Sequence, residues 1–195
     1  GNEGPELAFL YRNNGDGTFA RMTTNDVGTV ASDRTQSAVG LWGDYDNDGN
    51  LDLFLGSSTA GSRLYHNIGD GRFTAVTNNV RVNRMRTWGG SSADIDNDGS
   101  LDLFFDTADG NDRFFLNNRD GTFATPRSLP SFSYWSSWGD YDNDGDIDLF
   151  LGGDGGAARL FQNQGDGTLK GINSAVTSGV ICGAWGDYDN DGYLD

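Results

Sequence analysis

The sequence predicts an all-β protein, a β-propeller of four-stranded antiparallel blades with calcium-binding loops, and three observations support this fold class. The nine-residue pattern D-x-D-x-D-G-x-x-D occurs four times, and its first Asp lies at positions 44, 94, 140 and 187. A second phrase close to N-x-G-D-G-T-F alternates with this pattern. No segment sustains the i, i+3, i+4 apolar spacing of a long amphipathic helix. Four short strands in a unit of roughly 40–50 residues are typical of a propeller blade.

The first complete repeat shows the four strands expected in each blade. The first strand, 37–43 (SAVGLWG), leads into the Asp loop, and the second, 51–56 (LDLFLG), leaves it. The third and fourth strands are 63–67 (RLYHN) and 72–77 (RFTAVT). The second strand is almost continuously apolar, which is typical of a strand buried on both faces. The Gly-Asp-Gly turn between the last two strands predicts a hairpin, because Gly accepts the positive φ of a tight turn.

The repeats divide the chain into one propeller region, 1–195. We expect a partial blade at 1–30, blades at 31–79, 80–127 and 128–177, and a partial blade at 178–195. Two arrangements fit this order. We favour the interpretation that the sequence is one stretch of a larger propeller. The alternative is a closed ring of four blades in which the two partial blades join. The ring would leave one blade without most of its second strand.

The composition limits the partners that we expect. The net charge is −16, and 27 of the 29 acidic residues are Asp. Asp without Glu favours turns and metal loops over helix surfaces. An acidic chain repels nucleic acid, and no apolar run approaches the ~20 residues of a membrane span, so we expect neither nucleic-acid binding nor membrane insertion. Arg81, Arg84 and Arg86 form a basic cluster that we interpret as a solvated face.

The Asp pattern has the chemistry of a calcium loop. Ca²⁺ takes six to eight oxygen ligands at about 2.3–2.6 Å, and a glycine at position six allows the chain to turn around the ion. We expect carboxylate ligands at loop positions one, three, five and nine, and the main-chain carbonyl of position seven. The expected ligands are Asp44, Asp46, Asp48, Asn50 and Asp52 in loop 1 (44–52); Asp94, Asp96, Asp98, Ser100 and Asp102 in loop 2 (94–102); Asp140, Asp142, Asp144, Asp146 and Asp148 in loop 3 (140–148); and Asp187, Asp189, Asp191, Tyr193 and Asp195 in loop 4 (187–195).

Up to four Ca²⁺ ions are therefore predicted, and loop 4 is the least certain because Asp195 is the last residue. One His and one Cys disfavour zinc. An EF-hand would need a Glu at loop position twelve and flanking helices. The alternative interpretation is an Asp-rich turn that holds backbone N–H groups without a metal.

Catalysis has little support in the sequence, and we expect no enzyme activity. There is no nucleophile elbow and no His beside a Ser. The carboxylates weighed as a glycosidase pair are Asp106, Asp109, Asp112 and Asp154. His66 is interpreted as a tolerant surface position, and Cys182 as a small buried hydrophobe.

Tryptophans recur two residues before the Asp loops. Trp42, Trp138 and Trp185 share this register, which predicts packing between blades. Trp135 breaks the register, and together with Tyr134 it is the candidate for an exposed aromatic platform.

The stretch WGDYDNDGNLDLFLG followed by RLYHNIGDGRFTAVT resembles the FG-GAP/VCBS-type repeat, which is found in integrin α-subunit propellers and in many bacterial surface and secreted proteins. The resemblance covers nearly the whole chain. It implies a calcium-stabilised propeller, extracellular or cell-surface placement, and a protein, matrix or glycan ligand or self-assembly. One repeat departs from the pattern, because Trp88 lies six residues before loop 2 rather than two.

We therefore expect a non-catalytic extracellular calcium-binding module for adhesion, protein binding or assembly. The alternatives are a carbohydrate-binding, lectin-like propeller and an accessory propeller of a larger secreted enzyme.

Overall fold

The structure is a computed structural model that describes residues 9–32, 37–59, 61–77, 82, 85–107, 109–131, 133–153, 158–172 and 179–195. The expectations for Arg81, Arg84 and Asp154 fall outside these residues. The described part of the chain contains no helix that is both long and apolar enough to cross a membrane.

Three four-stranded antiparallel sheets dominate the fold, each with its strands in chain order. The first is β3 (Ser37–Gly43), β4 (Asp52–Ser57), β5 (Arg63–Asn67) and β6 (Phe73–Ala75). The second is β7 (Thr87–Ala93), β8 (Asp102–Thr107), β9 (Asp112–Phe115) and β10 (Arg127–Leu129). The third is β11 (Ser133–Gly139), β12 (Asp148–Gly153), β13 (Arg159–Asn163) and β14 (Leu169–Ile172). The all-β fold of four-stranded blades is thus confirmed.

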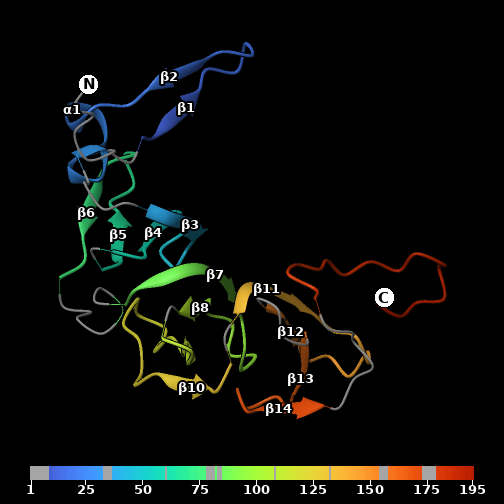
Figure 1. The fold of residues 1–195 in the computed structure, drawn as a ribbon. Helices are drawn as coiled ribbons and strands as arrows, with labels where there is room; N and C mark the ends of the chain where they lie inside the picture. Colours follow the sequence, from blue (N-terminus) through green and yellow to red (C-terminus); the bar gives the residue numbers. More distant parts are fainter. Residues whose placement is uncertain are drawn as a thin grey trace.

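The sheets follow one another along an open arc (Figure 1). Strands β3, β7 and β11 line its inner side, and β6, β10 and β14 lie outside, as in propeller blades. A hairpin of β1 (Tyr11–Asn13) and β2 (Phe19–Arg21) precedes them and forms a sheet of its own. The closed ring of four, in which this hairpin would share a blade with the C-terminal segment, is therefore not formed by the described residues.

The second strand of each blade is buried on both faces, as predicted. Every residue of β4 and β8 is buried. Alternate side chains of a strand point to opposite faces, so each such strand contributes to two cores. Leu53 and Leu55 pack with Val27 and Val30, and Phe54 packs in a separate cluster between the first two blades.

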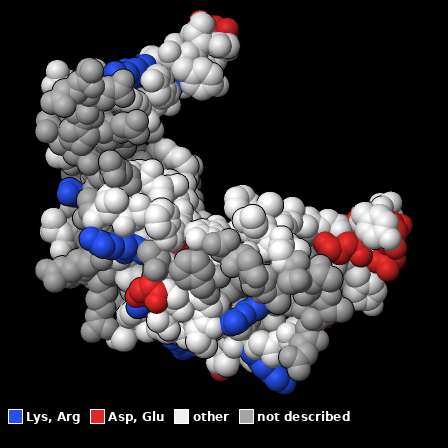
Figure 2. All heavy atoms as spheres, in the orientation of Figure 1, with Lys and Arg blue, Asp and Glu red and all other residues white. Residues whose placement is uncertain are grey.

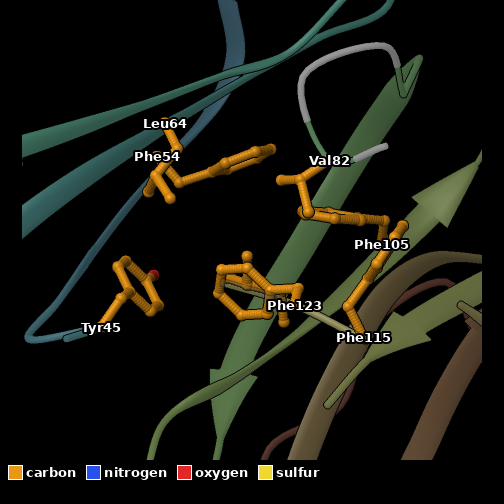
Figure 3. Packing of buried hydrophobic residues seen from close by; sticks show 8 residues of the cluster. Tyr45, Phe54, Leu64, Val82, Phe105, Phe115 and Phe123 are labelled. Atoms are coloured by element: carbon orange, nitrogen blue, oxygen red, sulfur yellow. The ribbon is translucent and has the colours of Figure 1, made fainter. Parts of the chain in front are cut away.

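The cluster between the first two blades shows how the sheets are held face to face (Figure 3). Phe54 from β4 lies 4.7 Å from Phe105 of β8, measured between ring centroids, and Phe105 lies 5.6 Å from Phe115 of β9. Truncating a buried Phe to Ala costs about 3–5 kcal/mol, so these rings account for a large part of the coupling between blades.

A short helical segment lies between the first hairpin and the first blade. It consists of α1 (Thr24–Val27) and the 3₁₀ turn η1 (Thr29–Ser32). Asp26 accepts hydrogen bonds from the Thr23 backbone N–H at 2.8 Å and from its hydroxyl at 2.7 Å. This capping begins α1, and Val27 and Val30 then cover the open face of the first blade.

Two expectations about the C-terminal repeat were wrong. The predicted first strand before loop 4 is not formed, since residues 180–186 have no strand assignment. Cys182 is exposed rather than buried. The physical reason is that, among the described residues, this segment meets the third blade through isolated contacts, such as Gly153 N–H to the Val180 carbonyl at 3.1 Å, and not through a strand ladder.

Candidate metal centre

The Asp loops share one backbone conformation. In loop 1 the Asp44 carboxylate accepts the N–H groups of Asp48 at 3.0 Å and Gly49 at 2.9 Å. Asn47 has a positive φ of 58° and Gly49 a φ of 90°. These two residues let the chain reverse around the carboxylates, as the sequence predicts. Loops 2, 3 and 4 repeat the contacts of the first Asp at 2.9–3.0 Å.

The ninth-position Asp ties each of the first three loops to the asparagine that ends or closely follows the third strand of its blade. Asp102 is fully buried and accepts the Ile95 N–H at 2.8 Å and the Asn117 N–H at 2.7 Å. Asp52 and Asp148 make the equivalent contacts in loops 1 and 3. The ninth residue is therefore a structural tie as well as an expected ligand.

Carboxylates from each loop converge on one point. Groups of three ligand atoms lie within 4.8 Å of one another, namely Asp44, Asp46 and Asp48; Asp94, Asp96 and Asp102; Asp140, Asp142 and Asp148; and Asp187, Asp189 and Asp195. Anions this close repel one another, and a bound cation would compensate them. The donors in these four groups are all oxygens, which suits a hard cation such as Ca²⁺, whereas a fifth group joins Asp46 and Asp52 of loop 1 to His66.

The third-position Asp provides the test of whether these residues fit a metal. The Oδ1 atoms of Asp46, Asp96 and Asp142 are buried and have no hydrogen-bond partner. A buried oxygen without a partner is costly, and it is unusual for the same atom to be orphaned at the same position of three repeats. The observation fits a ligand oxygen and disfavours the metal-free Asp turn as the full explanation.

Burial adds to the need for a cation. It raises the pKa of Asp102 to about 7, with the charges of Asp96 and Asp98 acting in the same direction. Burial also raises the pKa of Asp52 and Asp148. Ionising these groups inside the protein is unfavourable unless positive charge lies beside them.

The remaining expected ligands are placed less closely. Asp98, Asp144 and Asp191, at position five, are not members of the three-atom groups. The seventh residues Asn50, Asp146 and Tyr193 lie beside their loops, and Ser100 is buried. Ligation by their carbonyl oxygens stays a prediction.

Neighbouring loops are joined to one another by asparagine side chains. The fourth-position amide of each of the first three loops reaches the next loop: Asn47 Nδ2 donates to Ser100 Oγ at 3.1 Å, Asn97 Nδ2 to Asp146 Oδ1, and Asn143 Nδ2 to the Gly192 carbonyl at 2.8 Å. The four loops therefore lie side by side along one edge of the arc. Acidic side chains gather around the C-terminal segment that carries loop 4 (Figure 2).

The asparagine of the second phrase has a role that the sequence reasoning missed. Asn117 Nδ2 donates to the Tyr45 carbonyl of loop 1 at 2.7 Å and to the Leu101 carbonyl at 3.0 Å. Asn163 repeats this with the carbonyls of Ile95 and Ile147. The signal was present, because this Asn recurs in register in every repeat.

His66 was also underestimated. Its Nδ1 lies 3.0 Å from Asp46 Oδ2 and 3.2 Å from Asp52 Oδ1, so it faces loop 1 rather than bulk solvent alone. A cavity of about 440 Å³ lies here, and Asp120 and Thr122 of the next blade line its other wall. Gln162 occupies the same strand position and donates to Asp142 Oδ2 at 2.6 Å. In the first and third blades the residue at this position of the third strand therefore contacts the Asp at position three of the loop.

The three described carboxylates among those considered for catalysis, Asp106, Asp109 and Asp112, do not form an open pair. Asp106 and Asp112 lie in strands β8 and β9, not in loops, and both are buried. Ser133 Oγ lies 2.7 Å from each of them. Asp109 is exposed and forms an ion pair with Arg113.

The tryptophans divide differently from the expectation. Trp138 and Trp185 each pack against the preceding blade, Trp138 on Phe104 and Trp185 on Phe150, as predicted. Trp42 is 46% exposed, so its assignment to the core between blades was wrong. Its ring touches only the edge of Phe73 in its own blade among the aromatic contacts described. Trp135 is 49% exposed, as expected, and its Nε1 donates to the Gly183 carbonyl at 3.0 Å.

The model of the FG-GAP-like repeat matches the chain four times, over residues 3–55, 44–105, 94–150 and 140–195. These matches span nearly the whole sequence, so the chain belongs to the FG-GAP-like repeat family, and the resemblance seen in the sequence is confirmed. Curated proteins give no match. Among solved structures, the chain is similar to one chain in the structure of the Photorhabdus luminescens Tc holotoxin pore, with 19% identity and a TM-score of 0.48. That similarity covers 91% of this chain and 9% of the other, so this chain spans less than a tenth of that protein's length.

Proposed function

We propose that the protein is a non-catalytic, extracellular binding or assembly module whose blades are held together by Ca²⁺. The observation that carries the proposal is the orphaned Oδ1 of Asp46, Asp96 and Asp142, which recurs beside a group of converging carboxylates in loops 1, 2 and 3. In this proposal the residues of each loop bind one ion. The ion supplies the charge that lets the loop hold two strands of a blade at a fixed distance. Four bound Ca²⁺ would halve the formal net charge of −16.

Extracellular placement belongs to the same proposal. FG-GAP repeats are typical of extracellular proteins, and the expected calcium affinity is in the weak range of extracellular modules, on the order of 10⁻⁴ to 10⁻³ M. Such sites fill where calcium is abundant. The partner is proposed to be a protein, a matrix component or a second copy of the chain.

Thermal unfolding with Ca²⁺, with Mg²⁺ and with EGTA tests the calcium part. A ligand that binds only the folded state adds about 1.4–2.7 kcal/mol per site when its concentration is 10–100 times the dissociation constant. We expect a rise in melting temperature that Ca²⁺ produces and Mg²⁺ does not, because Mg²⁺ keeps most of its water. The variant Asp142→Asn should reduce the rise.

Asp166→Asn is the matched control for that variant. Asp166 lies in the adjacent hairpin turn, where its carboxylate accepts the Thr168 N–H at 2.8 Å and faces no loop cluster in the described residues. The control should keep the full calcium effect. A transition that is the same in EGTA and in excess Ca²⁺ would remove the basis of the proposal.

A lectin-like role is the second candidate, and one observation favours it. Trp88 in β7 and Trp135 in β11 lie on the inner strands of adjacent blades and are 47% and 49% exposed. Half-exposed aromatic faces are suitable surfaces for sugar rings. Binding on a glycan array that is lost in Trp135→Ala, with the melting temperature unchanged, would favour this role over protein binding.

A further inference from the structure

Arg119 stands at a turn position that is glycine in the other three repeats. Gly15, Gly69 and Gly165 have φ values of 81°, 91° and 76°, and Arg119 has a φ of 70°. A residue with a Cβ is disfavoured in this left-handed region, and arginine has no local side-chain contact that would favour it there. We therefore expect an interaction of the Arg119 side chain to explain why arginine occupies this turn.

The side chain of Arg119 reaches loop 2. Its Nε lies 2.8 Å from Oδ2 of Asp98, the fifth-position residue of that loop. The other oxygen of Asp98 accepts the Ser100 N–H at 2.8 Å, so both oxygens of this expected ligand have partners. The equivalent turn residue beside loop 1 is Gly69, which has no side chain to make this contact.

Loop 2 differs from its neighbours at a second point. In loops 1 and 3 the third strand places His66 or Gln162 against the third-position Asp. The corresponding residue of the second blade is Leu116, whose side chain has no polar atom. The second blade thus supplies a permanent cation from its turn where the others supply a neutral or titratable group from the strand.

We propose that Arg119 is an internal counter-cation of loop 2 that competes with Ca²⁺ for Asp98, so that loop 2 binds calcium more weakly than loops 1 and 3 and depends on it less. This inference rests on the proposed calcium binding. A guanidinium and a divalent ion at one carboxylate repel each other, and either the arginine must leave or the ion must do without this ligand. The Arg119 side chain is 64% exposed, and in the dielectric of bulk water this repulsion corresponds to about a tenfold change in a dissociation constant.

Calcium titration by calorimetry and melting in EGTA test the inference with three variants at one position. Arg119→Gly removes the charge and restores the residue of the other repeats, whereas Arg119→Asn removes the charge and keeps a side chain that tolerates positive φ. Arg119→Lys keeps the charge. We expect the Gly and Asn variants to bind one Ca²⁺ about tenfold more tightly, and the Lys variant to resemble the parent protein.

The melting temperature in EGTA tests the counter-charge separately, because a change of calcium affinity alone would not alter it. Without calcium, loop 2 of the Gly and Asn variants keeps its carboxylates but has lost its counter-charge. Their melting temperature in EGTA should fall below that of the parent protein, and excess Ca²⁺ should close the gap. Arg72→Thr is the matched control, since it removes one positive charge from the turn of the first blade and introduces the residue found there in the other repeats.

The outcomes separate this inference from the proposed function. Calcium isotherms and EGTA melting temperatures that are the same in all variants would overturn the role of Arg119 and leave calcium binding intact. An effect in Arg119→Gly that is absent in Arg119→Asn would also overturn it, because backbone strain and not charge would then be the cause. If neither the parent protein nor any variant binds Ca²⁺, the proposed function fails, and the competition with it.

Discussion

Replacing Asp106 by Asn should remove a pH-dependent loss of stability from the core between the second and third blades. Asp106 stands in β8 where the first and third blades have glycine, and it is buried. Its Oδ1 accepts the hydroxyl of Ser133, which is also within 2.7 Å of Asp112 Oδ2. One hydroxyl proton can serve only one of these carboxylates. Asp112 Oδ2 also accepts the Ser131 hydroxyl at 2.6 Å, so Asp106 is a buried carboxylate that shares its Ser133 donor with a second, better supplied one.

The magnitude follows from the pKa of the buried group. Burial, aided by the charge of Asp112, raises the pKa of Asp106 from an ordinary value of 3.8 to about 6. The folded state then binds this proton more tightly than the unfolded state does. The contribution to stability is fully present below pH 4 and is lost as the pH rises through about 6. The difference between the two pKa values corresponds to about 3 kcal/mol.

Urea denaturation at pH 4.5, 6 and 7.5, with calcium at the same saturating level, measures this contribution. Groups distant from Asp106 titrate alike in the parent protein and in Asp106→Asn, so the difference in unfolding free energy between the two proteins reports Asp106 together with its coupling to Asp112. This difference should move in favour of the variant by about 2 kcal/mol between pH 4.5 and 7.5, because about a third of the loss has already occurred at pH 4.5. Asp109→Asn is the control, because the hydrogen bond from Arg113 lowers the pKa of Asp109 and its contribution is lost only as the pH falls below the ordinary value of 3.8; its difference from the parent protein should therefore stay nearly constant between pH 4.5 and 7.5. A difference between Asp106→Asn and the parent that does not change with pH would refute the reasoning.

Three further changes should have specific effects. Asn117→Ala removes a buried amide that donates to two loop carbonyls, and it should lower the unfolding free energy measured by urea denaturation by about 2–4 kcal/mol. Asn67→Ala is the control and should cost less, because the amide contact of Asn67 to the Leu51 carbonyl is exposed. Gly152→Ala would place a Cβ only 2.0 Å from the Ile181 carbonyl oxygen and should lower the unfolding free energy by about 2 kcal/mol or more. Gly40→Ala is the control, because its Cβ would make an ordinary contact at 3.8 Å and should change the melting temperature little. Asp142→Asn should lower the number of Ca²⁺ ions bound in calorimetry by one, and an unchanged number would show that loop 3 is not a site.

The sequence by itself determined the blades. The spacing of the Asp pattern and the apolar second strand located β3 and β5 at the observed residues and β4 within one residue. The Asp loops were equally readable, because the converging carboxylates of each loop lie within nine consecutive residues and local turn chemistry controls their conformation. Asn47 and Gly49 adopt the positive φ values that the pattern requires. Features whose partners are close in sequence were thus predictable without a structure.

Only the tertiary structure decided the contacts that cross from one blade to the next. Asn117 of the second blade reaches the Tyr45 carbonyl of loop 1 over 72 residues, and Asn163 of the third blade reaches the Ile95 carbonyl of loop 2 over 68. The exposure of Trp42 and Cys182 likewise depends on which segments pack over them, and periodicity within a single strand does not report this. The physical reason is that a repeat specifies its own strands by local pattern, whereas the pairing of side chains between repeats depends on how the sheets stack.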